Sequence, residues 1–215
     1  MKKRTLPYII SIALIIIFLK MLIDVLNNGP ITNLDTLLNT KLQLLWNPLL
    51  NNIMIFITRI ADTIPLIILS VILLAILIYK KRLYHSLLLA SALIIGEIFK
   101  QTIKFLIQRA RPENALIHAE GFSFPSGHAT TAIIFFSLLI YFFKDNIKNK
   151  LLKNLFIAAN ITLILLIGFS RIYLGVHWLS DVIAGFCLGL FLVIFLSLIS
   201  DRLGNLYKEK KLTFS

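Results

Sequence analysis

Cysteine and charged residues are both scarce in this chain. Only one of its 215 residues is a cysteine, Cys187, which excludes an intrachain disulfide and leaves the redox compartment open. Charged residues make up 15% of the sequence and hydrophobic residues 58%, and the mean hydropathy is +0.88. Because an ordinary water-soluble domain carries about 25% charged residues, the composition predicts a membrane protein.

Acidic residues are also few. The sequence holds ten Asp and Glu against 22 Lys and Arg, which gives a formal net charge of +12. Such an excess is compatible with nucleic-acid binding, but here the basic residues flank the ends of apolar segments. We therefore interpret the charge as membrane topology, with a supporting attraction to anionic lipid headgroups, and expect no nucleic-acid partner.

Apolar stretches long enough, or nearly long enough, to span a bilayer recur along the chain. A spanning helix needs about 20 mostly apolar residues. The candidate stretches are Pro7–Leu26, Ile64–Tyr79, Leu83–Lys104, His128–Phe143, Leu155–Leu174 and Asp181–Ile199. They occupy most of the sequence, so we expect an all-α fold with six transmembrane helices and a single domain over residues 1–215.

The basic residues at helix ends fall on one side of the predicted membrane. They are Lys2, Lys3, Arg4, Lys80, Lys81, Arg82, Lys144, Lys148, Lys150, Lys153, Arg202, Lys208, Lys210 and Lys211. The positive-inside rule makes this side cytoplasmic, with both termini inside and the polar segments Asn27–Asp62 and Arg109–His128 outside. No small-residue cleavage signal follows the first helix, so it is expected to be a retained anchor in the cell membrane.

The first outer segment contains a further helical pattern. Apolar residues recur at roughly helical spacing, at Ile31, Leu34, Leu37, Leu38, Leu42 and Leu45. This pattern predicts an amphipathic helix on the outer surface, anchored by Trp46. The following piece, Leu49–Ala61, is short for a span and is expected to extend the next helix outward or to pack beneath the surface helix.

Ionisable residues also occur within the apolar helices. Lys20 and Asp24 are one turn apart, and so are Glu97 and Lys100, and the simplest interpretation of both is a structural ion pair. Lys104 differs because it precedes Arg111 by two turns and points the same way if the helix continues. Pro112 disfavours helical conformation at Arg111, so the helix is expected to end near there.

A serine, a glycine and a histidine precede the fourth apolar stretch. Ser126-Gly127 at a helix start leaves backbone N–H groups pointing outward, and the helix dipole adds partial positive charge. This arrangement predicts an anion site with His128 beside it.

The fifth and sixth stretches are joined by a segment with a second histidine. His177 and Asp181 are one helical turn apart, which lets the carboxylate accept Nδ1–H and leaves Nε2 unprotonated. A neutral, oriented imidazole is a competent nucleophile toward phosphorus. Arg171 precedes it, and its planar guanidinium suits phosphate oxygens.

The polar segments together resemble the type-2 phosphatidic acid phosphatase family, also called the lipid phosphate phosphatases. The family pattern is Lys, six residues, Arg-Pro; then Pro-Ser-Gly-His; then Ser-Arg, five residues, His, three residues, Asp. The sequence matches all three parts, at Lys104 and Arg111-Pro112, at Pro125–His128, and at Ser170-Arg171, His177 and Asp181. The six-helix layout is also similar to that of the family.

The resemblance implies a metal-independent phosphatase acting on a lipid phosphate or pyrophosphate in the bilayer. His177 would form a phosphohistidine, Asp181 would orient it, and His128 would protonate the leaving oxygen. Lys104, Arg111, Ser126, Gly127 and Arg171 would bind the phosphate. Undecaprenyl pyrophosphate, phosphatidylglycerophosphate and phosphatidate are the implied substrate types, with no cofactor.

Other kinds of site and function are less consistent with the sequence. A zinc or magnesium site is disfavoured, because the outer loops offer few clustered His and carboxylate ligands. A transporter typically lines a midplane pathway with broken helices, whereas these charges cluster at outer helix ends. Vanadate-binding haloperoxidases share a similar pocket but are soluble. His118, Glu113 and Glu120 match no family position and are interpreted as substrate-rim or solvated residues.

Overall fold

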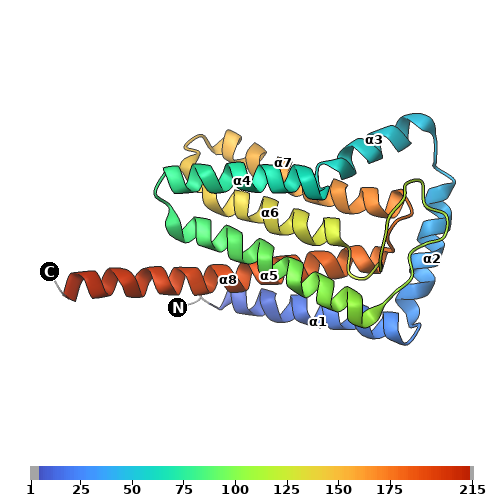
Figure 1. The fold of residues 1–215 in the computed structure, drawn as a ribbon, viewed down its shortest axis with the longest axis horizontal. Helices are drawn as coiled ribbons and strands as arrows, with labels where there is room; N and C mark the ends of the chain where they lie inside the picture. Colours follow the sequence, from blue (N-terminus) through green and yellow to red (C-terminus); the bar gives the residue numbers. More distant parts are fainter. Residues whose placement is uncertain (1–4, 214–215) are drawn as a thin grey trace.

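The computed structural model describes residues 5–213, with side chains up to Arg202 (Figure 1). All regular structure in this range is helical. The elements are α1 (Leu6–Leu26), α2 (Pro30–Gln43), α3 (Pro48–Arg59), α4 (Thr63–Tyr79), α5 (Leu83–Ile107), α6 (Gly127–Phe143), a short 3-10 helix η2 (Lys144–Asn146), α7 (Lys150–Tyr173) and α8 (Leu179–Thr213). Lys2, Lys3 and Arg4, and the side chains of Lys208, Lys210 and Lys211, on which the topology prediction also rests, lie outside the described residues.

The predicted six-span, all-α arrangement is confirmed. α1, α5, α6 with η2, α7 and α8 to Arg202 are each long and apolar enough to cross a membrane. α3 and α4, which meet at a bend of 43°, pass the same test as a pair. The largest boundary difference is at α8, which continues to Thr213 rather than ending at Ile199. α7 begins at Lys150 rather than at Leu155, because the Asn149 side chain caps it by accepting a hydrogen bond from Leu152 N at 3.1 Å.

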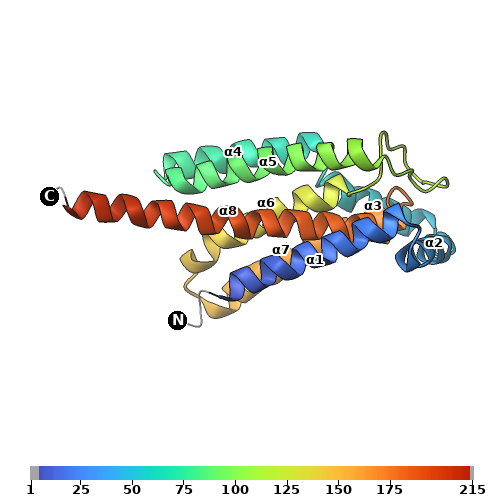
Figure 2. The same ribbon diagram turned by 90° about the horizontal axis from the view of Figure 1, so that it is seen from below.

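The core is built around α6, which packs against α5, α7 and α8. Leu89, Ile134, Leu138 and Ile167 are fully buried there. Figure 2 shows α1 running along α8 at one side of the bundle. On α1 the only buried residue is Asp24, and most of the large apolar side chains are exposed, as expected of a helix facing lipid.

Two helices lie at one end of this bundle. Figure 1 shows α2 crossing the ends of the long helices and α3 running from the upper right of the view back to the start of α4. The predicted surface helix is therefore present, and Trp46 is tied to the bundle by a 2.8 Å hydrogen bond from Nε1 to the Tyr173 carbonyl. The buried residues of α2, however, are Asp35 and Leu42. A carboxylate turned inward is not expected of a simple amphipathic helix.

Candidate active site

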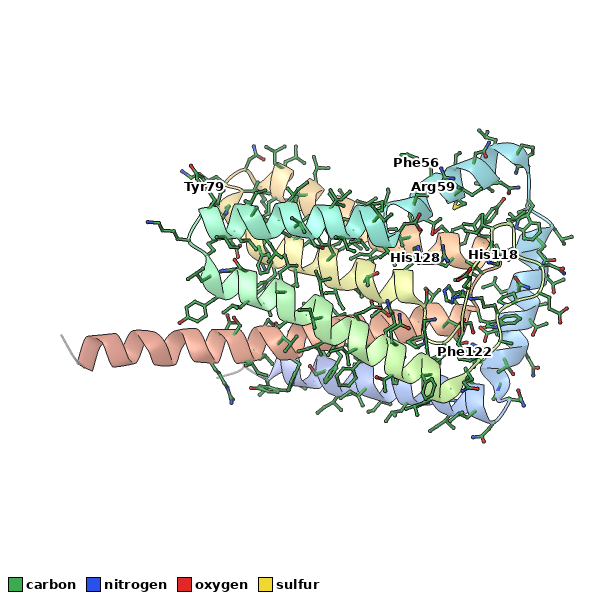
Figure 3. The ribbon with its side chains drawn as sticks, in the orientation of Figure 1. Phe56, Arg59, Tyr79, His118, Phe122 and His128 are labelled. Atoms are coloured by element: carbon green, nitrogen blue, oxygen red, sulfur yellow. The ribbon has the colours of Figure 1, made fainter. Side chains whose placement is uncertain are left out.

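The three polar segments predicted from the sequence converge at the α2 end of the bundle. Figure 3 shows His128 at the start of α6, with His118 and Phe122 on the loop that connects α5 to α6. A pocket of about 390 Å³ opens there, between the α3–α4 bend, the end of α5 and the starts of α6 and α8. It is lined by most of the predicted site residues, namely Lys104, Arg111, Gly127, His128, Arg171 and His177.

His177 lies at the inner wall of this pocket with both ring nitrogens engaged. Nδ1 is 3.3 Å from Asp181 Oδ2, and Nε2 is 3.1 Å from Nη1 of Arg111. A guanidinium only donates hydrogen bonds, so Nε2 is the acceptor and carries the lone pair, while Nδ1–H donates to the carboxylate. The predicted tautomer therefore follows from the two partners of the ring.

The surroundings of His177 also keep it uncharged. Burial lowers the pKa of His177 well below its usual value, and the nearby cations Arg171, Arg111 and Lys104 lower it further. The side chain is 2% exposed. A neutral imidazole with a fixed lone pair at a pocket wall has the form required of a nucleophile.

Backbone geometry places His177 after the end of α7. Gly175 has φ +69° and lies so close to the α5–α6 loop that an added Cβ would be 2.7 Å from the Asn114 carbonyl oxygen. Only glycine accepts this conformation and this contact without strain. The chain therefore turns sharply between α7 and α8 and returns His177 toward the pocket.

Asp181 lies behind His177 and is fully buried. It is the third residue of α8, and its Oδ2 also accepts a 2.9 Å hydrogen bond from Trp178 N, the pattern by which an acidic side chain caps the start of its own helix. Oδ1 accepts a 2.6 Å bond from Arg109. The orientation of this carboxylate is therefore fixed by partners other than the imidazole.

The three cations predicted to bind phosphate all line the pocket but are held differently. Arg171 is 4% exposed and donates to Thr58 Oγ1 at 2.7 Å, and its Nε has no partner among the described residues. Lys104 donates to the Phe122 carbonyl, and Arg111 donates to the carbonyls of Gly121 and Glu120 at 2.9 and 2.8 Å. Lys104 and Arg111 therefore also hold the α5–α6 loop in place.

The start of α6 forms another side of the pocket. Ser126 is the N-cap residue and is fully buried, its N–H bonded to the Asp181 carbonyl at 2.9 Å. Its Oγ, like Arg171 Nε, has no partner within the described part of the chain. A buried polar group without a partner costs about 1–3 kcal/mol. Of the predicted site residues, Ser126 and Asp181 do not line the pocket, so at the start of α6 Gly127 and His128 form its wall.

His128 is paired with a carboxylate that the sequence analysis did not assign. Its Nε2 is 2.8 Å from Oδ1 of Asp62, the N-cap residue of α4. Because a carboxylate accepts, Nε2 of His128 carries a proton. The sequence contained the charge at Asp62 but no periodicity linking it to a histidine 66 positions away. Thr58, the partner of Arg171, was missed for the same reason.

Arg109 and Asp35 were also missed by the sequence analysis. Arg109 is one of the six unspecified residues inside the first motif and bonds Asp181, whereas Asp35 lies outside all three motifs and bonds Ser180. Gln108 ends α5 in the left-handed conformation, with φ +50°, and the chain turns there immediately before Arg109. No pattern in the sequence predicts a left-handed glutamine.

The residues left open by the sequence analysis lie at the rim of the pocket. His118 and Glu120 are almost fully exposed, with 3.5 Å between His118 Nε2 and Glu120 Oε1, and Glu113 lines a neighbouring cavity. In the part of the chain that the structure describes, no group of three or more His, Cys, Asp or Glu side chains is arranged to hold a metal ion. The two expected ion pairs, Lys20–Asp24 and Glu97–Lys100, are both present.

Comparisons with known proteins find related sequences that span most of this chain. Residues 85–204, which include all three motifs, match the family model of the PAP2 superfamily. Phosphatidylglycerophosphatase B of Bacillus subtilis (strain 168) is 31% identical over 179 residues, covering 82% of this chain and 88% of that protein. Undecaprenyl-diphosphatase of Sulfolobus acidocaldarius is 27% identical over 170 residues, covering 76% of each chain.

A solved structure is similar over most of the fold. The crystal structure of a transmembrane PAP2-type phosphatidylglycerolphosphate phosphatase from Bacillus subtilis superposes with a TM-score of 0.82 and 28% sequence identity. The match covers 89% of this chain and 96% of that one. The likeness therefore extends beyond residues 85–204 to the helices that precede them.

Proposed function

This chain belongs to the PAP2 superfamily and is a multi-pass membrane phosphatase of lipid phosphates or pyrophosphates, and on that premise we propose that it works through a phosphohistidine on His177. The observation that carries this proposal is the position of His177 at the pocket wall, with Asp181 on Nδ1 and a lone pair on Nε2. A passive transporter of a phosphorylated lipid has no need of an oriented nucleophile.

Substrate binding comes first in the proposed mechanism. The phosphoryl oxygens are held by Lys104, Arg111 and Arg171 and by the N–H groups at the start of α6, where Gly127 lines the pocket. Ser126, the buried N-cap residue of the same turn, is proposed to complete the cradle. Nη1 of Arg111 exchanges its bond to His177 Nε2 for a phosphate oxygen. This exchange frees the lone pair of the imidazole at the moment the phosphorus atom is in place.

The chemical step is an in-line displacement. His177 Nε2 attacks the phosphorus, the P–N bond forms, and the bond to the lipid oxygen breaks. His128, as an imidazolium, gives its Nε2 proton to that oxygen and becomes a neutral imidazole, and the imidazolium that forms on His177 is stabilised by Asp181. The three cations neutralise the charge that spreads over the equatorial oxygens, which is the main requirement of phosphoryl transfer.

Hydrolysis of the intermediate completes the cycle. A water molecule attacks the phosphohistidine and gives its proton to His128, which restores the general acid and releases phosphate. Because charge neutralisation is assigned to Lys104, Arg111 and Arg171, we propose that no metal is needed. Activity is then expected to survive EDTA and to be blocked by vanadate, and loss with EDTA that magnesium restores would contradict this part.

The substrate is proposed to be a lipid whose tail stays in the bilayer. The pocket lies at the ends of the spanning helices, so membrane anchoring would bring the phosphate to the depth of His177 and supply proximity. The relatives' names point to phosphatidylglycerophosphate and undecaprenyl pyrophosphate as leading candidates. The site residues bind the phosphoryl group, so they do not separate these two.

A comparison of substrates tests the function directly. Catalytic efficiency is measured in detergent micelles for an isoprenoid pyrophosphate, a glycerolipid phosphate and a soluble phosphate monoester. The catalytic efficiency for one of the two lipids is expected to exceed that for the soluble ester by at least about tenfold. Only the two lipids are held at the depth of the pocket by their tails. Equal or better hydrolysis of the soluble ester would refute the lipid assignment.

We also propose that the pocket faces the outside of the cell and that both termini are cytoplasmic. The basic residues Lys80–Arg82 and Lys144–Lys153 lie at the opposite end of the bundle from the pocket, which supports this orientation by the positive-inside rule. A cysteine introduced at Asn114, with Cys187 removed, should react with an impermeant thiol reagent in intact cells. Labelling only after permeabilisation would invert the orientation.

A further inference from the structure

A buried carboxylate on α2 lies against the first turn of α8. The Asp35 side chain is 1% exposed, whereas its neighbours Leu34 and Leu37 point outward. Its Oδ1 accepts from Ser180 N at 2.9 Å, and its Oδ2 accepts from Ser180 Oγ at 2.5 Å. A surface helix thus supplies a cap to the start of the helix that carries Asp181.

Arg109 connects this carboxylate to the active site. Its Nη2 is 2.7 Å from Asp35 Oδ2, and its Nη1 is 2.6 Å from Asp181 Oδ1. The guanidinium also lies over the Trp178 ring, 5.4 Å from the ring centroid, and is 12% exposed. One partly buried cation therefore lies between two buried carboxylates, and the three groups together carry a net charge of −1.

The shared cation matters for His177. If Arg109 were paired with Asp181 alone, the two side chains would form a neutral pair. Little negative charge would then remain on Asp181 Oδ2, the oxygen that faces the His177 imidazole. Asp35 shares the guanidinium of Arg109 with Asp181, so Arg109 neutralises only part of the charge on Asp181. The group formed by Asp35, Arg109 and Asp181 therefore keeps one negative charge, which faces Nδ1 of His177 through Asp181. The effect reaches the nucleophile through Asp181, because Asp35 itself does not line the pocket.

We propose that Asp35, through Arg109, is a positioning residue that keeps the negative charge of Asp181 available to the His177 nucleophile and fixes the first turn of α8. The inference rests on the proposed function, since it assumes that His177 attacks phosphorus. It gives α2 a role in the chemistry, although this helix lies outside the residues that match the family model.

The test uses charge changes of opposite sign on the full-length protein. The variants are Asp35→Asn, Arg109→Gln and the double variant, with Asp24→Asn as the matched control. Asp24 is another buried carboxylate, 6% exposed, whose cation is Lys20. The measurements are kcat, KM and the acid limb of kcat/KM, which reports protonation of His177 in the free enzyme.

Positively and negatively charged groups face His177, and together they set its pKa in the unmodified protein. They are Lys104 on α5, Arg111 on the α5–α6 loop, His128 on α6, Arg171 on α7 and Asp181 on α8. Asp35→Asn removes negative charge, so the acid limb should move to lower pH while kcat falls about tenfold or more and KM changes by less than about twofold. Arg109→Gln removes positive charge, so the limb should move to higher pH while kcat also falls.

The double variant distinguishes charge balance from structural damage. It restores a net charge of −1, so its acid limb should return toward that of the wild type, and its kcat should exceed that of Arg109→Gln. Asp24→Asn should change neither quantity. Additive losses of kcat with an unmoved acid limb would overturn the inference, and if Asp35→Asn does not fold, Arg109→Gln and the double variant still decide it.

A second readout separates this inference from the proposed function. The titration of the His177 ring by nitrogen NMR, with labelled histidine, does not require turnover. Opposite shifts in Asp35→Asn and Arg109→Gln support the charge arrangement even if no lipid phosphate is hydrolysed, in which case only the proposed function fails. Equal or absent shifts in an active enzyme refute the role of Asp35 and leave the function standing.

Discussion

The two histidines of the pocket are each paired with a carboxylate, but in very different surroundings. The side chains of His177 and Asp181 are 2% and 0% exposed, whereas those of His128 and Asp62 are 22% and 46% exposed. Asp181 is also held by Trp178 N and Arg109, while Asp62 lies at the break between α3 and α4. The His177–Asp181 pair is therefore almost fully shielded from solvent, although His177 lines the pocket, whereas the His128–Asp62 pair is open to solvent.

The nitrogen that faces each carboxylate differs as well. On His177 the carboxylate binds Nδ1 and leaves Nε2 for the phosphorus. On His128 the carboxylate binds Nε2, whose proton must therefore turn from Asp62 to the leaving oxygen during the reaction. A buried pair suits a nucleophile that must not move, and an exposed pair suits an acid that exchanges partners in every turnover.

The largest effect is expected at the nucleophile. His177→Ala should reduce kcat to the background level, because the attack on phosphorus is assigned to the lone pair of His177 Nε2 at the pocket wall. Rapid quenching with labelled substrate should trap an acid-labile phosphoprotein in the wild type and none in this variant. Labelling of His177→Ala at the same site would show that another residue forms the intermediate.

Removal of the buried carboxylate is expected to have the next largest effect. Asp181→Asn should lower kcat by about 10³-fold to 10⁴-fold with a small change in KM, since an amide can stabilise the wrong tautomer of His177. His177 is neutral over most of the accessible range, so raising the pH should not restore the rate. A loss below about tenfold would mean that Arg111 alone sets the tautomer.

The effect of removing the proposed general acid, His128, is expected to depend on the leaving group of the substrate. His128→Ala should lower kcat by about 10²-fold to 10³-fold for an alkyl lipid phosphate, and much less for an aryl phosphate, whose leaving oxygen needs no proton. His85→Ala is the matched control, because that histidine packs against Phe142 at the other end of the bundle. Equal losses on both substrates would assign His128 to binding rather than to proton transfer.

The contrast between the two pairs also marks what the sequence can predict. The spans, the surface helix and the pairing of His177 with Asp181 follow from apolar runs and one-turn spacings, which are local properties of the chain. Asp62, Asp35 and Arg109 reach the site across helix packing and a left-handed turn at Gln108. Such contacts depend on how helices distant in sequence are arranged, and no local pattern encodes them.

The smallest effect is expected at the exposed carboxylate. An ion pair this accessible is typically worth about 0.2–1 kcal/mol, which corresponds to less than about fivefold in rate, so Asp62→Asn should lower kcat/KM only slightly. The loss should be greater for the alkyl lipid phosphate than for the aryl ester, since it acts through His128. Asp145→Asn, which removes an exposed partner of Lys153 at the far end of the bundle, is the control. A loss as large as that of Asp181→Asn would mean that His128 is held as rigidly as His177, and the distinction between a fixed nucleophile and an exchanging acid would fail.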